Sequence, residues 1–75
     1  MSKTKRERFE EVASRRVNGA ITALQSLQKC SNIYNYEYSE ADVNKIVNTL
    51  RKQIDELKIN FDMGLRKHKE KFKFD

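Results

Sequence analysis

Two long stretches of this chain repeat apolar residues every three or four positions, and only a short segment between them lacks the pattern. Such spacing places side chains on one face of an α-helix. The first face consists of Phe9, Ala13, Val17, Ala20, Leu24 and Leu27. The second face consists of Val43, Ile46, Val47, Leu50, Ile54, Leu57, Phe61 and Leu65. The chain is therefore predicted to be all-α, with two long helices.

The two apolar faces also match each other when the chain is folded back on itself. In an antiparallel hairpin, the residue numbers of facing positions add to a constant, and here that constant is 70. The facing pairs are Phe9–Phe61, Ala13–Leu57, Ala20–Leu50, Leu24–Ile46 and Leu27–Val43. Alanines of the first helix thus meet leucines of the second, as close packing requires. The sequence predicts a single helical-hairpin domain over residues 1–75, with helices over about 4–31 and 39–72.

Local signals predict where each helix begins and ends. Thr4 and Glu7 have the spacing of a capping box, and Ser39 is placed to cap the second helix. Asn32 is the best candidate for a left-handed residue after the first helix, with Ile33 folding back onto Leu27.

An Asn-Gly pair in the middle of the first stretch offers a competing interpretation, since such pairs often mark turns. A helix-turn-helix centred on Gly19 is the alternative to a continuous helix. The apolar spacing continues from Val17 to Ala20 without a break. We therefore predict a continuous helix through Gly19.

The amino-acid composition indicates whether the chain self-associates and which cellular compartment suits it. Charged residues make up 36% of the chain and there is no proline, as is typical of long helices. A two-helix core is thin, so association into a dimeric four-helix bundle is expected. A single cysteine, Cys30, excludes an internal disulfide framework and suits a reducing cytoplasm. We expect neither a membrane-spanning helix nor a secretory signal in this sequence.

Signals for catalysis are nearly absent, and no catalytic residue, metal site, cofactor or small-molecule substrate is predicted. His68 is the only histidine and Cys30 the only thiol, and the hairpin would hold them at opposite ends. The acidic residues fit solvated helix faces, with Glu11–Arg15 and Asp62–Arg66 spaced as i,i+4 ion pairs. The protein is therefore predicted not to be an enzyme.

Basic residues concentrate near both ends of the chain, which a hairpin would bring together. Residues 1–16 and 66–75 hold eleven positive and five negative side chains, whereas the remainder has a net charge of −1. We call this predicted region the basic pole. Its candidate binding residues are Lys5, Arg6, Arg8, Arg15, Arg16, Arg66, Lys67, Lys69, Lys71 and Lys73. Solubility and the helix dipole explain the C-terminal lysines, but the cations at the first helix start oppose the dipole, which favours a binding role.

Two further groups are candidates for contact with a partner. The basic C-terminal extension, 66–75, contains Phe72 and Phe74, which would have no facing residue in the hairpin. The connector, 32–38, contains all three tyrosines of the chain, of which Tyr34 and Tyr36 are candidate hot spots. The other interpretation of the tyrosines is structural, as a cover for the open end of the hairpin.

The segments "ASRRVNGAITAL" and "CSNIYNYEYSEADVNKIV" resemble a family of short, poorly characterised bacterial proteins that look like products of phages and conjugative elements. The resemblance covers about residues 8–60. The matching residues are Arg16, Val17, Asn18, Ser31, Asn32, Asn35, Tyr36, Tyr38, Ser39 and Asp42. The chain departs from the family pattern in having Cys30 in place of leucine and in its basic tail after Phe61. The resemblance implies a mobile-element setting and no particular reaction.

These observations lead to two main functional hypotheses. The first is a non-enzymatic binding protein that contacts DNA or RNA phosphates through the basic pole, with salt-sensitive affinity. The second is a phage-encoded inhibitor, similar in role to an anti-CRISPR protein, that binds a host defence protein. A purely structural oligomerisation module and a membrane-surface helix are the remaining alternatives.

Overall fold

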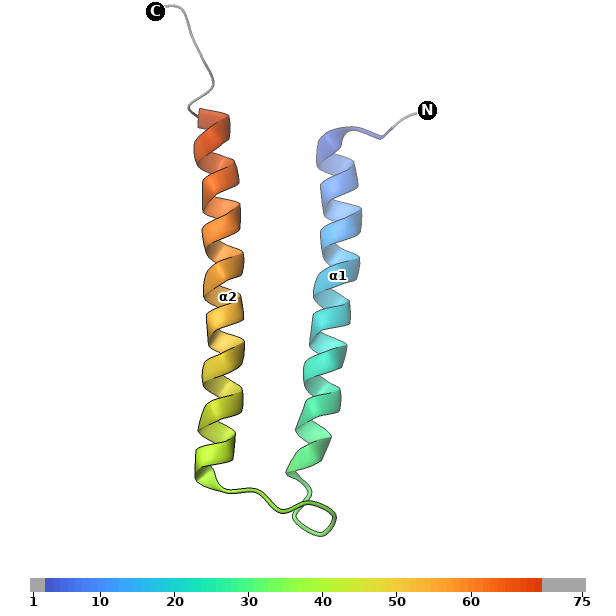
Figure 1. Cartoon of the computed structure of the whole chain (residues 1–75). Helices are drawn as coiled ribbons and strands as arrows, with labels where there is room; N and C mark the ends of the chain where they lie inside the picture. The colour runs from blue at the N-terminus through green and yellow to red at the C-terminus, as the bar shows by residue number, and fades with distance from the viewer. Residues whose placement is uncertain (1–2, 70–75) are drawn as a thin grey trace, which may run out of the picture. The chain divides into compact units, whose positions relative to one another are not determined.

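A computed structural model describes residues 3–69 of the chain, with only the backbone described for residues 68 and 69. It contains helix α1 (Lys5–Gln28), the short 3₁₀ turn η1 (Lys29–Ser31) and helix α2 (Glu40–Lys69), labelled in Figure 1 where space allows. No strand occurs between residues 3 and 69. The all-α class is therefore confirmed, whereas the predicted end of the second helix at residue 72 lies outside the described residues.

The chain divides into two units, and the boundary along the sequence falls between Tyr38 and Ser39. The first unit holds α1, η1 and the loop after them, and the second unit holds α2. Each unit is described by itself, so the antiparallel pairing of the two helices remains a prediction.

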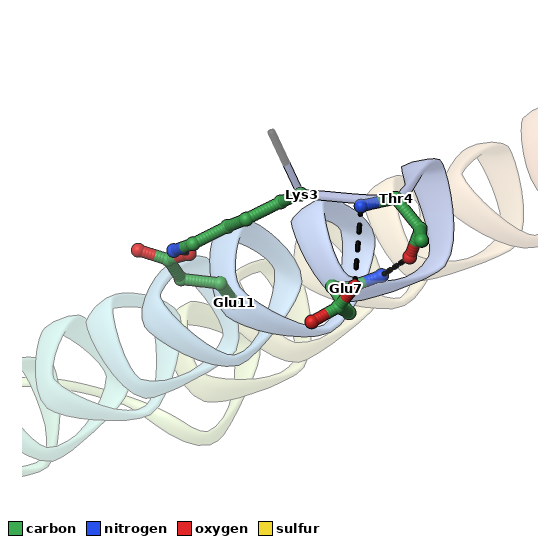
Figure 2. A network of polar contacts seen from close by, with 4 residues as sticks. All are labelled: Lys3, Thr4, Glu7 and Glu11. Carbon is green, nitrogen blue, oxygen red and sulfur yellow. Dashed lines mark hydrogen bonds and ion pairs between the residues drawn. The ribbon is translucent and has the colours of Figure 1, made fainter. Parts of the chain in front are cut away.

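The start of α1 is stabilised by the predicted capping box, which Figure 2 shows. The Glu7 amide donates to the Thr4 hydroxyl oxygen at 3.0 Å, and the Thr4 amide donates to the Glu7 carboxylate at 3.2 Å. Two of the amides that a helix start leaves without helical acceptors are thereby satisfied. The predicted start at Thr4 is confirmed, with Thr4 as the N-cap residue.

Helix α1 continues through the Asn-Gly pair without a turn. Gly19 does not adopt positive φ, and the Asn18 carbonyl also accepts from the Thr22 hydroxyl at 3.0 Å. The helix-turn-helix alternative is therefore wrong. The unbroken apolar spacing outweighed the turn preference of Asn-Gly, because a turn would have divided one apolar face into two.

The end of α1 differs from the prediction. Asn32 is extended, with φ −67° and ψ 106°, and none of the non-glycine residues described has positive φ. The predicted left-handed Asn32 is therefore wrong, whereas the contact of Ile33 with Leu27 stays a prediction. The helix tightens instead into η1, where the Lys29 amide reaches the Ser26 carbonyl three residues back.

Asn32 ends the helix by organising the turn that follows. Its side-chain oxygen accepts from the Tyr34 amide at 3.0 Å. Its backbone oxygen accepts from the amides of Asn35 and Tyr36 at 3.2 Å and 3.0 Å. This local bonding competes with a continued helix and needs no left-handed residue.

The start of α2 confirms the predicted cap at Ser39. The Asp42 amide donates to the Ser39 hydroxyl oxygen at 3.2 Å, and the Ser39 amide donates to the Asp42 carboxylate at 2.9 Å. The first helical hydrogen bond runs from the Val43 amide to the Ser39 carbonyl at 3.1 Å. Glu40 and Asp42 add negative charge to the first turn, where the helix dipole favours it.

We expect the substitution Ser39→Ala to lower the stability of α2 by about 1 kcal/mol, because one amide of the first turn loses its acceptor. Helix content and thermal unfolding, both followed by circular dichroism, measure the effect. The conservative variant Ser39→Thr should restore most of the loss, since threonine also caps helices. An unchanged melting curve for Ser39→Ala would show that the cap contributes little.

We expect Gly64→Ala to raise stability by about 0.5–1 kcal/mol, because glycine loses more backbone freedom than alanine on entering a helix. Gly64 lies within α2, does not adopt positive φ, and leaves open space where a β-carbon would be. Thermal unfolding measures the gain. A loss of stability would instead show that another surface packs closely against Gly64.

The apolar faces of both helices remain accessible to solvent. None of the residues whose side chains are described is buried. The least exposed are half-buried by neighbours in the chain, and they are Val12, Ala13, Val47, Leu50 and Asp62. Side chains such as Leu24, Ile54 and Leu57 are exposed on single helices that span several turns. A helix gains most of its stability from packing such a face against another surface.

Candidate nucleic-acid interface

Five candidate binding residues lie in the first half of α1. They are Lys5, Arg6, Arg8, Arg15 and Arg16. At about 100° per residue, four of the five fall within an arc of about 100° on one side of the helix, and Arg6 falls outside it. The four residues Lys5, Arg8, Arg15 and Arg16 are called the cationic face from here on.

Every carboxylate of α1 is engaged within the same part of the chain. Glu7 belongs to the capping box, Glu10 accepts from Arg6 Nε at 2.9 Å, and Glu11 pairs with Lys3 (Figure 2). The helical spacing had predicted an ion pair between Glu11 and Arg15, but Glu11 pairs with Lys3 instead. These surface pairs add little stability, about 0–1 kcal/mol each, but they determine which cations are neutralised.

Arg6 is held by two neighbours. Its guanidinium carbon lies 5.5 Å from the centre of the Phe9 ring, a cation–π contact, while Nε bonds Glu10. The sequence predicted that Arg6 binds an anion. In the structure its guanidinium already interacts with the Glu10 carboxylate and the Phe9 ring. Phe9 and Glu10 follow Arg6 by three and four residues, and this helical spacing could have predicted both contacts.

The basic residues of α2 belong to the second unit. Arg66 and Lys67 are exposed on the last turns of α2, and Lys69 is its final residue. Lys71, Lys73, Phe72 and Phe74 lie outside the described residues. Asp62 pairs with Lys58 at 3.0 Å rather than with Arg66. Because the two units are described separately, the structure does not test whether the basic residues of α1 and α2 meet.

The tyrosine connector forms a hydrogen-bonded loop that presents two of its rings to solvent. Tyr34 is 92% exposed and Tyr36 is 54% exposed, and Ile33 beside them is 70% exposed. The amides of both tyrosines are bonded to Asn32. The loop therefore combines a bonded backbone with exposed apolar and aromatic side chains, which is typical of surfaces that bind proteins.

Tyr38 differs from the other two tyrosines. Its hydroxyl donates to the Ser31 carbonyl at 2.7 Å, so it closes the loop onto η1. The position of Tyr38 in the connector did not predict this bond. The bond spans seven residues of irregular backbone, for which neither helical nor strand periodicity gives a signal.

The part of the chain that the structure describes has neither a cluster of metal ligands nor a helix able to cross a membrane. No group of three or more histidine, cysteine, aspartate or glutamate side chains there is arranged to hold a metal ion. Neither α1 nor α2 combines the length and apolar character that crossing a lipid bilayer demands.

Comparison with known proteins finds no relative of this chain. No protein-family model matches the chain, and no curated protein or solved structure matches it. The class that the structure defines is an all-α chain with two charged amphipathic helices.

Proposed function

We propose that this chain is a non-enzymatic binding protein of a bacterial mobile element, which contacts nucleic-acid phosphates through its basic residues in the host cytoplasm. The observation that carries the proposal is the cationic face of α1, where four basic side chains have no ion pair within residues 3–69. The net charge of +5 supports attraction to a polyanion. The mobile-element setting rests on the resemblance in residues 8–60.

The same proposal includes the antiparallel hairpin and its association into a four-helix bundle. The constant sum of 70 for facing positions supports the hairpin. The exposed apolar side chains of each helix support burial against a second surface, since neither helix covers its own face. A hairpin would place Arg66, Lys67 and the lysines that follow them near the start of α1, forming the basic pole.

A fluorescence-anisotropy titration with labelled duplex DNA and single-stranded RNA, at low and moderate salt, tests the proposal. We expect measurable binding that weakens steeply as salt rises, because phosphate contacts release counterions. Absence of binding to either probe at low salt would reject nucleic-acid binding. A pull-down from bacterial lysate, with and without nuclease, distinguishes direct protein partners from proteins held through nucleic acid.

The second candidate function is a phage-encoded inhibitor of a host defence protein, of the anti-CRISPR kind. It is favoured by one specific observation, the exposure of Tyr34 and Tyr36 on a loop whose backbone is internally bonded. A preformed loop loses less conformational freedom on binding a partner protein. If this candidate is correct, Tyr34→Ala with Tyr36→Ala removes partner binding, whereas loss of basic residues mainly slows association.

A further inference from the structure

The ion pairs of α1 leave the unpaired basic residues of this helix on one side of it. Lys5 and Arg8 are one turn apart, and Arg8 and Arg15 are two turns apart. The cationic face extends about 16 Å along the axis from Lys5 to Arg16, at 1.5 Å per residue. It therefore lies within one rigid element and does not depend on where α2 lies.

The acids of α1 leave this face uncompensated. Glu10 and Glu11 neutralise Arg6 and Lys3, neither of which belongs to the face, and Glu7 serves the cap. The face thus retains four positive charges. In water such charges are screened beyond about 10 Å at 0.1 M salt, so a ligand gains from them only by close contact.

We propose, resting on nucleic-acid binding as the function, that the cationic face contacts the backbone phosphates of duplex nucleic acid in preference to a single strand. Duplex DNA carries one negative charge for about each 1.7 Å of its axis, so phosphates are dense enough to meet all four cations. Single-strand binding combines positive charge with bases that stack on aromatic side chains. The one aromatic residue of α1 is Phe9, which borders the face, and the Arg6 guanidinium already lies over one side of its ring.

The test compares two variants of equal charge in the full-length chain. The face variant carries Lys5→Gln, Arg8→Gln, Arg15→Gln and Arg16→Gln. The control variant carries Lys29→Gln, Lys45→Gln, Arg51→Gln and Lys52→Gln, which removes the same charge from exposed positions outside the face. Glutamine retains helix propensity similar to that of lysine and arginine, and circular dichroism verifies helix content. A double variant, Arg8→Gln with Arg15→Gln, provides a milder change.

Affinities are measured by anisotropy with a labelled duplex of about 20 base pairs and with one of its strands. With a salt slope of about 0.9 per phosphate contact, the face variant should lose about 4,000-fold in duplex affinity at 0.1 M salt, and its slope should fall by about 3–4. The double variant should lose about fiftyfold by the same slope. The control variant should lose less than about tenfold, because it lowers the net charge but removes no cation of the face.

Each other outcome has a defined meaning. Equal losses in the face and control variants would overturn the cationic face while leaving nucleic-acid binding in place, since only net charge would then matter. Tighter binding of wild-type protein to the single strand than to the duplex would overturn the duplex preference. Absence of wild-type binding to both probes would reject the proposed function itself.

Discussion

Reversing the charge of Lys69, Lys71 and Lys73 to glutamate is expected to abolish measurable binding to duplex DNA at moderate salt. Each phosphate contact adds about 0.9 to the slope of log affinity against log salt concentration, so losing three contacts lowers affinity about 500-fold at 0.1 M salt. The three new negative charges add repulsion. Anisotropy titrations at two salt concentrations measure the loss. Helix content should stay unchanged, because Lys69 ends α2.

The matched comparison is the double change Tyr34→Ala and Tyr36→Ala. These residues precede α2, whose 30 residues extend about 45 Å along its axis. That length is several times the screening distance of about 10 Å, so the tyrosines should not influence phosphate contacts at the far end of α2. We therefore expect duplex affinity within about twofold of wild type, an upper limit set by that screening. A large loss of duplex affinity from the tyrosine change, with little from the lysine change, would instead place the nucleic-acid contact on the tyrosine connector and contradict the basic pole.

Replacing Leu50 by aspartate is expected to abolish self-association and to remove much of the helix content. Leu50 lies in the middle of the apolar face of α2 and is already half-buried on the single helix. A buried leucine lost from a core costs about 2–5 kcal/mol, and an unpaired carboxylate in its place costs more. A small core supplies only about 3–5 kcal/mol in total, so one such change exceeds what the assembly can lose.

The control is Asn48→Asp, which introduces the same carboxylate about 145° from the middle of the apolar face of α2. We expect this variant to keep wild-type helix content and association. Sedimentation equilibrium should give a dimer for wild type and for the control, and a monomer for Leu50→Asp. A stable wild-type monomer at micromolar concentration would contradict the four-helix bundle.

The sequence predicted the helices and their starts well because those features depend on neighbours a few residues apart. The capping residues Thr4 and Ser39 each find their partner three positions along the chain. The apolar spacing through Gly19 predicted a continuous helix, and the structure contains one. These are local interactions, and their geometry follows from the helical repeat alone.

The structure was needed wherever several local partners compete for one group. Glu11 has both Lys3 and Arg15 within reach, and spacing alone favoured Arg15, although the structure pairs it with Lys3. The sequence predicted Arg6 as a binding residue, but its guanidinium already contacts Glu10 and Phe9. The cationic face follows from these choices among competing partners, which depend on side-chain conformation.

The loop shows the same division most clearly. The sequence by itself determined that residues 32–38 interrupt the helical pattern and that the tyrosines gather there. Only the three-dimensional structure decided that Asn32 is extended and that the Tyr38 hydroxyl closes the loop on Ser31. The physical reason is that irregular backbone has no repeat, so its conformation depends on which side chains satisfy its amides and carbonyls.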